Sequence, residues 1–126
     1  MDSPLFRILA IGGLFVLIIL LGYGLKFTGK PYNPVLFNVH KLIAVITTVW
    51  LILIARSVHL GAGIDQAGWI LIGLGAFFLL TAIVTGGLLS VEHSMQSWVG
   101  ITHHLLPYTS AALWIAALAR ILYPGS

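Results

Sequence analysis

Four long apolar stretches dominate the pattern of hydrophobic and polar positions along the chain. They cover residues 5–25, 35–58, 69–89 and 99–122. Each has the length of helix, about 20 residues, that crosses a hydrocarbon core about 30 Å thick. Because lipid offers no hydrogen-bonding partner to unpaired backbone groups, the α-helix is the expected conformation of all four. The pattern therefore predicts four transmembrane helices.

The segments between these stretches are short and rich in turn-forming residues. The first, KFTGKPYNP at residues 26–34, contains a glycine and two prolines. The second contains Gly61, Gly63 and Gly68, and the third is the polar segment EHSMQS at residues 92–97. Short links make consecutive helices antiparallel neighbours. We therefore expect an all-α fold, a four-helix transmembrane bundle with up-down-up-down topology.

The composition agrees with a single transmembrane domain that fills residues 1–126. Hydrophobic residues make up 60% of the chain and charged residues only 7%, whereas a soluble domain carries about 25% charged residues. The net charge of +3 then indicates anchoring at the membrane interface, not nucleic-acid binding. Without cysteine, thiolate metal sites and disulfides are excluded, which leaves five histidines as the main chemical resource.

The basic residues give no orientation in the membrane. Three arginines fall on one predicted side and three lysines on the other: Arg7, Arg56 and Arg120 against Lys26, Lys30 and Lys41. The positive-inside rule needs an excess on one side. Orientation therefore stays undetermined at this level.

The two halves of the chain repeat each other at an offset of 64 residues. Four residues superpose on identical ones: Gly22 on Gly86, His40 on His104, Trp50 on Trp114 and Arg56 on Arg120. Histidine, tryptophan and arginine are rare in this chain, so their joint match is the informative part. The match favours two related helical hairpins about a pseudo-twofold axis along the membrane normal. The alternative is that similar helices need similar anchors. We expect both arginines at the interface opposite the histidines, and both tryptophans to be packing residues.

His40 and His104 each lie one to two turns inside an apolar helix, at matching depth. An imidazole at that depth needs a partner. At the same depth the other two helices carry four small residues: Gly22, Gly24, Gly86 and Gly87. These glycines either let the helices approach closely or leave room for a large flat ligand. Haem b suits the second interpretation, because two imidazoles across a bundle core can occupy both axial positions of its iron.

With His40 and His104 early in two parallel helices, and Gly22 and Gly86 beside them, the chain resembles the small four-helix membrane cytochromes b of bacteria. The resemblance implies one bis-histidine haem b that carries electrons, often from a quinol. It also implies the inner, cytoplasmic membrane of a bacterium or archaeon. Dihaem members place two histidines on one helix face, whereas His40 and His59 are about 100° out of register. A second haem is therefore not expected.

The remaining polar residues near this layer have weaker predicted roles. Lys41 lies where haem propionates would emerge toward water, although an ordinary interfacial role suits it equally well. His103 points about 100° away from His104 and is the second choice as a ligand. His93, in the third loop, could also bind a metal, be solvated, contact a propionate or donate a proton. His59 ends the second helix, where a structural role is expected.

Three functions remain open. The leading one is electron transfer through one haem b near one membrane face. This function makes the chain an electron carrier in preference to a stand-alone enzyme. One haem cannot span about 30 Å of hydrocarbon, so a quinone, a redox partner protein or a second membrane subunit is implied. The second is a non-haem metal site or metal permease built on four histidines: His40, His93, His103 and His104. The third is a non-catalytic scaffold subunit of a membrane complex.

Overall fold

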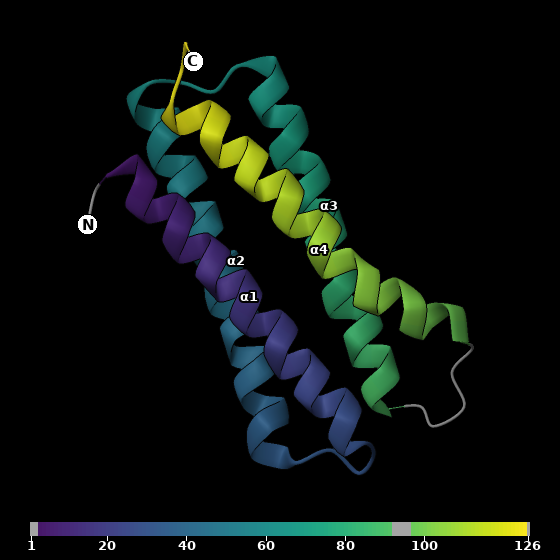
Figure 1. The fold of residues 1–126 in the computed structure, drawn as a ribbon. Coiled ribbons are helices and arrows are strands. Elements are labelled where there is room, and N and C mark those ends of the chain that lie inside the picture. Colours follow the sequence, from purple (N-terminus) through teal and green to yellow (C-terminus); the bar gives the residue numbers. More distant parts are fainter. Residues whose placement is uncertain (1–2, 92–96, 126) are drawn as a thin grey trace. The chain divides into compact units, whose positions relative to one another are not determined.

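The computed structural model describes residues 3–91 and 97–125, and within them the chain forms four α-helices. Their bounds are α1 Pro4–Thr28, α2 Pro34–Gly61, α3 Gln66–Val91 and α4 Ser97–Leu122 (Figure 1). All four are long and apolar enough to cross a membrane. The predicted all-α class with four membrane-spanning helices is therefore confirmed.

Polar caps explain why α1 and α2 begin just before their apolar stretches. The Ser3 side chain accepts a hydrogen bond of 3.1 Å from the backbone N–H of Phe6. Asn33 Oδ1 accepts from the N–H groups of Val35 at 3.0 Å and Leu36 at 3.1 Å. A proline follows each cap at the start of the helix, where its fixed φ suits the first turn and its missing N–H costs nothing.

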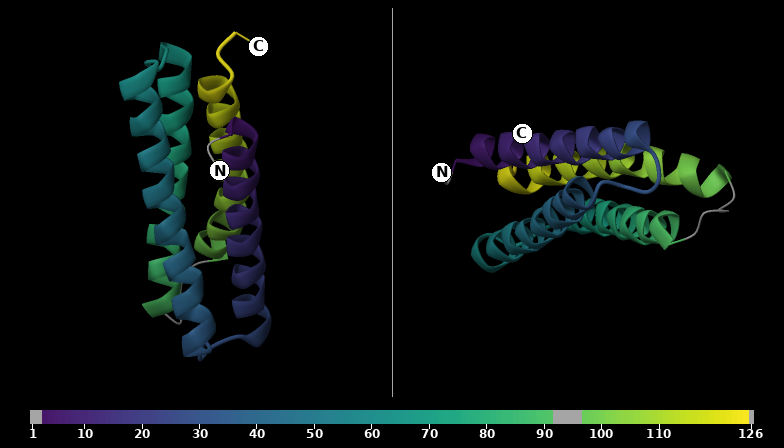
Figure 2. Two further views of the ribbon diagram at one scale, coloured as in Figure 1. Left: turned by 90° about the vertical axis from the view of Figure 1, so that its left-hand side faces the viewer. Right: turned by 90° about the horizontal axis from the view of Figure 1, so that it is seen from below.

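The chain divides into two compact units, Met1–Gly63 and Ile64–Ser126, and each is a helical hairpin. In the first hairpin α1 and α2 lie side by side and antiparallel, and in the second α3 and α4 do the same (Figures 1 and 2). The predicted pairing of consecutive helices is thus confirmed within each hairpin.

Large apolar side chains are exposed along every helix. Examples are Leu9, Leu20, Ile52, Leu53, Phe77, Leu80, Ile101 and Leu105. Water would penalise such a surface, whereas lipid accepts it. The chain is therefore a membrane protein whose helices contact the lipid bilayer.

The buried side chains show how the first helices of the two hairpins correspond. Three buried residues of α1 superpose on buried residues of α3: Ile11 on Gly75, Phe15 on Leu79 and Ile18 on Ala82. Each pair is 64 residues apart, so α1 and α3 follow the offset predicted from the sequence.

The second helices correspond at an offset of 63 residues instead. All four buried residues of α2 then superpose on buried residues of α4: Thr47 on Ser110, Leu51 on Trp114, Ile54 on Ala117 and Ala55 on Leu118. The first residues of the two helices, Pro34 and Ser97, are also 63 apart. At an offset of 64 residues, only one of these four residues, Ile54, would superpose on a buried residue of α4. The single 64-residue offset is therefore wrong by one residue for α2 and α4.

A shift of one residue along a helix moves a side chain to another face, because successive side chains are about 100° apart. Trp50 accordingly is half-buried, whereas only 3% of the Trp114 surface is exposed. The packing role predicted for Trp114 is confirmed, but the two tryptophans do not occupy equivalent positions. The two hairpins thus correspond in their buried faces. In α2 and α4, the identical residues that suggested the repeat lie one residue away from this correspondence.

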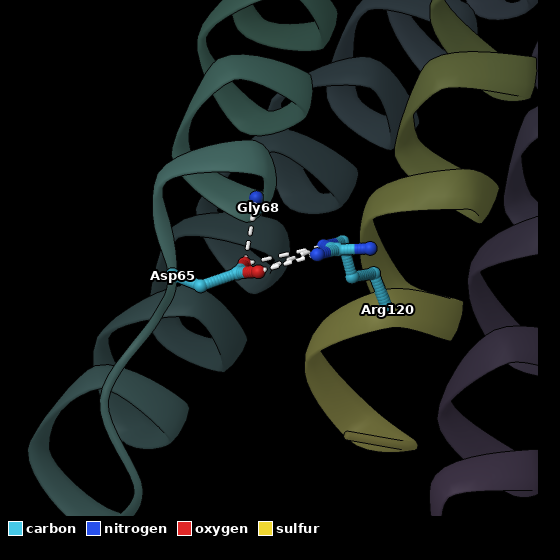
Figure 3. Close-up of polar contacts among 3 residues, drawn as sticks. All are labelled: Asp65, Gly68 and Arg120. Carbon is cyan, nitrogen blue, oxygen red and sulfur yellow. Dashed lines mark hydrogen bonds and ion pairs between the residues drawn. The ribbon is translucent and has the colours of Figure 1, made fainter. Parts of the chain in front are cut away.

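Within the second hairpin, Asp65 joins the start of α3 to the end of α4 (Figure 3). Its Oδ1 accepts a hydrogen bond of 2.9 Å from the backbone N–H of Gly68 and so caps the helix. Its Oδ2 accepts from Arg120 Nε at 3.0 Å and from Arg120 Nη2 at 2.6 Å. The ion pair is exposed on both sides, which suits the interfacial position predicted for Arg120.

Replacing Asp65 by Asn should lower the thermal stability of the protein in detergent at pH 7. Asparagine can still cap α3, so the difference isolates the charge interaction with Arg120. Hydrogen bonds from Arg120 and Gly68 lower the pKa of Asp65 in the folded protein. The wild-type advantage should therefore be constant above the ordinary aspartate pKa of about 4. It should shrink as the pH falls through the lowered pKa of the folded state. An advantage that grows on acidification would contradict this role.

Candidate functional site

In the first hairpin, His40 of α2 lies against Gly22 of α1. A Cβ atom added to Gly22 would lie 3.5 Å from Cε1 of the His40 ring, an ordinary van der Waals contact. His40 is six residues into α2, which is about 9 Å from the helix start at 1.5 Å per residue. His40 and Gly22, which the sequence predicts to lie at the same depth, are therefore neighbours within this hairpin.

The ring of His40 is incompletely satisfied. It interacts with the backbone carbonyl of Ile18, but its buried Nδ1 reaches no partner among the described residues at hydrogen-bond geometry. Leaving a buried polar atom without a hydrogen bond costs about 1–3 kcal/mol. A hydrogen-bonding partner for Nδ1 of His40 would therefore stabilise the protein.

In the second hairpin, the ring beside the glycine belongs to His103. A Cβ atom added to Gly86 would lie 2.7 Å from Cε1 of His103, too close for any side chain without movement. His103 Nδ1 lies 2.9 Å from the carbonyl oxygen of Ala82 and 3.2 Å from Oγ1 of Thr85. The imidazole of His103 is thus fixed against α3.

These hydrogen bonds determine where the His103 proton lies. A carbonyl oxygen can only accept, so Nδ1 must carry the hydrogen that bonds to Ala82. The Thr85 hydroxyl donates to the carbonyl oxygen of Thr81 at 2.8 Å, so its oxygen is also placed to accept from Nδ1. In the neutral ring the lone pair then lies on Nε2. Histidines that bind metals commonly show this arrangement, with one nitrogen on the metal and the other donating to a carbonyl.

The contacts make His103 the counterpart of His40. Ile18 and Gly22 of α1 correspond to Ala82 and Gly86 of α3 at 64 residues, while His40 corresponds to His103 at 63. Both histidines are the sixth residue after the first residue of their helices. The residue expected from the sequence, His104, lies one step further round α4.

The other predicted haem-facing residues have varied surroundings. His104 is half-buried, and its ring centroid is 5.8 Å from that of His103. A Cβ atom on Gly24 would lie 3.3 Å from Leu36 Cδ2, so this glycine allows close approach of α1 and α2. A Cβ atom on Gly87 would meet nothing within 4 Å.

Charged and polar residues near the ends of the helices are more exposed. The Lys41 ammonium lies 4.0 Å from the centroid of the Phe37 ring, a cation–π contact at the surface. His59 is exposed and lies in the last turn of α2, where the sequence places it. His93 lies outside the described residues. Within residues 3–91 and 97–125, no three metal-ligating side chains form a group that could hold a metal ion.

Two groups at this site were missed from the sequence. The carbonyl oxygens of Ile18 and Ala82 carry no sequence signal, because every residue has a carbonyl. Thr85 could have been noticed, since it is a polar residue in an apolar stretch directly before Gly86. Its counterpart in α1 is Leu21, which has no hydroxyl. This difference means that no threonine hydroxyl is available to Nδ1 of His40 at that position.

Replacing Gly86 by Ala should destabilise the second hairpin, because the methyl group would overlap the His103 ring. Overpacking of this kind costs about 1–3 kcal/mol. The matched control is Gly87→Ala, where the added methyl group meets nothing within 4 Å. Thermal unfolding in detergent should show a lower midpoint for Gly86→Ala and little change for Gly87→Ala. Equal midpoints for the two variants would contradict the contact between Gly86 and His103.

Comparison with protein-family models, curated proteins and solved structures finds no match to this chain.

Proposed function

We propose that this chain is a membrane-embedded b-type cytochrome that carries electrons through one haem b near one membrane face. Each hairpin supplies one axial histidine to the iron. His40 is the ligand from the first hairpin, and the adjacent pair His103 and His104 supplies the second. Sequence matching alone favours His104 for that position.

The observation that carries this proposal is the pairing of a half-buried histidine with a glycine in both hairpins. His40 lies beside Gly22, and His103 lies beside Gly86. In both hairpins the histidine is the sixth residue after the first residue of its helix, so the two contacts lie at the same helix position. Histidine at membrane depth is costly and is generally retained for a functional reason.

The residues present suit haem as the bound group. Imidazole is the side chain that ligates iron in bis-histidine cytochromes, and the surrounding helices provide an apolar environment. Binding of iron at the other ring nitrogen of His40 would leave Nδ1 to carry the hydrogen. That nitrogen could then donate to the carbonyl oxygen of Ile18, with which the ring already interacts.

The remaining parts of the site would hold the cofactor and exclude water. The small residues Gly22, Gly24, Gly86 and Gly87 limit the side-chain volume at this depth of α1 and α3. Lys41 is exposed beside His40 in sequence and could pair with a carboxylate at the membrane surface. When bound, haem supplies an iron that accepts and releases one electron at a time.

A single haem near one face requires a partner for its electrons. The hydrocarbon core is about 30 Å thick, so a quinone, a redox partner protein or a second membrane subunit completes the transfer. The proposal places the chain in the cytoplasmic membrane of a bacterium or archaeon, as an electron carrier and not a stand-alone enzyme.

The test is the cofactor content of the protein purified in detergent from cells supplied with iron and haem precursor. The cytochrome proposal predicts one protohaem and one iron atom per chain, from a pyridine haemochrome assay and elemental analysis. Iron, copper or zinc bound without porphyrin would support the non-haem metal site or permease instead. Protein that contains neither metal nor porphyrin, and takes up no added haem, would favour the scaffold function.

A further inference from the structure

We infer that the end of the first hairpin where α1 leads into α2 binds the headgroup of an anionic phospholipid. Lys26 of α1 and Lys41 of α2 are the residues that attract the phosphate group. All the residues involved belong to one hairpin (Figure 1). Such binding is separate from electron transfer and needs no bound cofactor.

Positive charge is concentrated in the first hairpin. Its described residues, 3–63, contain no aspartate or glutamate and five basic residues: Arg7, Lys26, Lys30, Lys41 and Arg56. In residues 64–91 and 97–125 of the second hairpin, by contrast, the single aspartate Asp65 pairs with the single arginine Arg120. No carboxylate side chain within residues 3–63 can therefore neutralise Lys26 and Lys41. A headgroup with net negative charge is a suitable partner for them.

A contact within α2 directs the ammonium group of Lys41 toward the membrane surface. Lys41 is seven residues after Pro34, which is about 10 Å along the helix from its start. Its Nζ lies 4.0 Å from the centroid of the Phe37 ring, and Phe37 is one turn nearer the start of α2. The charged end of the side chain thus points toward the interface, as is common for lysines near the ends of membrane helices.

The aromatic rings beside Lys41 are typical of the headgroup level. The Phe37 ring stacks on the Tyr32 ring, with 5.7 Å between the two centroids. The face of an aromatic ring attracts a cation, and tyrosine is enriched where hydrocarbon meets headgroups. The stacked pair therefore holds the ammonium group of Lys41 where its N–H groups can donate to phosphate oxygens.

Lys26 adds a second exposed ammonium group at this end, from the last turn of α1. The phosphate of a zwitterionic lipid already has a cation in the same headgroup, whereas the phosphate of an anionic lipid has none. A lysine near an anionic membrane surface strengthens association about fivefold, which corresponds to about 1 kcal/mol. The two lysines should therefore select anionic over zwitterionic phospholipids.

Electron paramagnetic resonance of spin-labelled lipids measures this preference on the full chain in phosphatidylcholine vesicles. The wild type should associate with labelled phosphatidylglycerol more strongly than with labelled phosphatidylcholine. The double variant Lys26→Gln, Lys41→Gln should lower that preference about fivefold or more. The matched control Arg7→Gln, Arg56→Gln removes the same charge at the other end of the hairpin and should keep most of the preference. Equal losses in the two double variants, or no loss in the first, would overturn the site.

A second pair of variants tests the position of Lys41 without changing any charge. Phe37→Leu removes the ring that holds the ammonium group and should weaken the preference for phosphatidylglycerol. Phe27→Leu should not, because the exposed Phe27 ring stacks on Tyr23. Equal preferences in these two variants would contradict the role of the aromatic pair.

Inorganic phosphate distinguishes a lipid headgroup from a free anion. At millimolar concentration it should displace no more labelled phosphatidylglycerol than chloride does at the same ionic strength. Specific displacement by phosphate would mean that a free anion occupies the site, and it would overturn the lipid assignment. None of these measurements requires haem, so their outcome is independent of the cytochrome proposal.

Discussion

If the chain binds haem as proposed, replacing His40 by Ala should remove the haem from the purified protein or convert it to a high-spin form. His40 is the only histidine in the first hairpin that lies at the depth of the site, since His59 is in the last turn of α2. Water is a weak substitute for imidazole in apolar surroundings. The haem content per chain should therefore fall at least tenfold, or the sharp bands of the reduced spectrum should disappear.

The matched control for this substitution is His59→Ala, made on the same helix. His59 is exposed and lies nineteen residues beyond His40, which is about 28 Å along a helix. Its replacement should leave haem content and spectrum unchanged. If His40→Ala retains a wild-type spectrum, or if His59→Ala loses it, the site has been placed at the wrong end of the first hairpin.

The second large effect is expected where Gly75 meets Trp114. A Cβ atom on Gly75 would lie 3.0 Å from both Cδ1 and Nε1 of Trp114, and Trp114 is almost completely buried. Gly75→Ile should therefore force the indole and α3 apart, at a cost of about 1–3 kcal/mol or more. Titration with a denaturing detergent should show a much lower midpoint for this variant.

The double variant Gly75→Ile, Trp114→Leu should recover much of that loss. At the corresponding positions the first hairpin has Ile11 and Leu51, both with 0% of their surface exposed. The second hairpin therefore fills this space with one small and one large residue, Gly75 and Trp114. The first hairpin fills the corresponding space with two residues of intermediate size. Trp114→Leu alone should leave a cavity and cost on the order of 2 kcal/mol. If the stability loss of the double variant equals the sum of the losses of Gly75→Ile and Trp114→Leu, the Gly75–Trp114 pair does not correspond to the Ile11–Leu51 pair.

The four helices could be predicted from the sequence because their length and apolarity are strong signals. The caps at Ser3 and Asn33 are also readable, since each precedes a proline and an apolar stretch. The sequence further predicts that consecutive helices pair, as they do within each hairpin. These features depend on local chemistry and on short links, and both are visible in a single chain.

The relation between the hairpins was harder to predict, because identical residues are not the ones that pack. The Trp50–Trp114 and Arg56–Arg120 matches follow an offset of 64, but Trp50 is only half-buried and both arginines are exposed. On the buried faces of α2 and α4 the matching residues differ in type, as with Leu51 and Trp114. Different pairs of side chains can fill the same space between two helices, so equivalent packing does not require identical residues. A one-residue difference in offset therefore escaped sequence comparison.

The same reason explains the ambiguity at the site. His103 and His104 are adjacent and chemically identical, so only their orientation distinguishes them. That orientation depends on contacts with Ala82, Thr85 and Gly86 of another helix. No periodicity in α4 alone could reveal which ring faces α3. Long-range packing decides which histidine is the counterpart of His40.

The optical spectrum of the purified wild-type protein, recorded before and after reduction with dithionite, tests the presence of a bis-histidine haem most directly. Two neutral imidazoles on the iron should give a low-spin spectrum, with sharp and well-separated α and β bands on reduction. The oxidised protein should give the matching low-spin signals in electron paramagnetic resonance. A colourless protein that cannot be reconstituted with haem, or a high-spin spectrum in the wild type, would contradict the bis-histidine site.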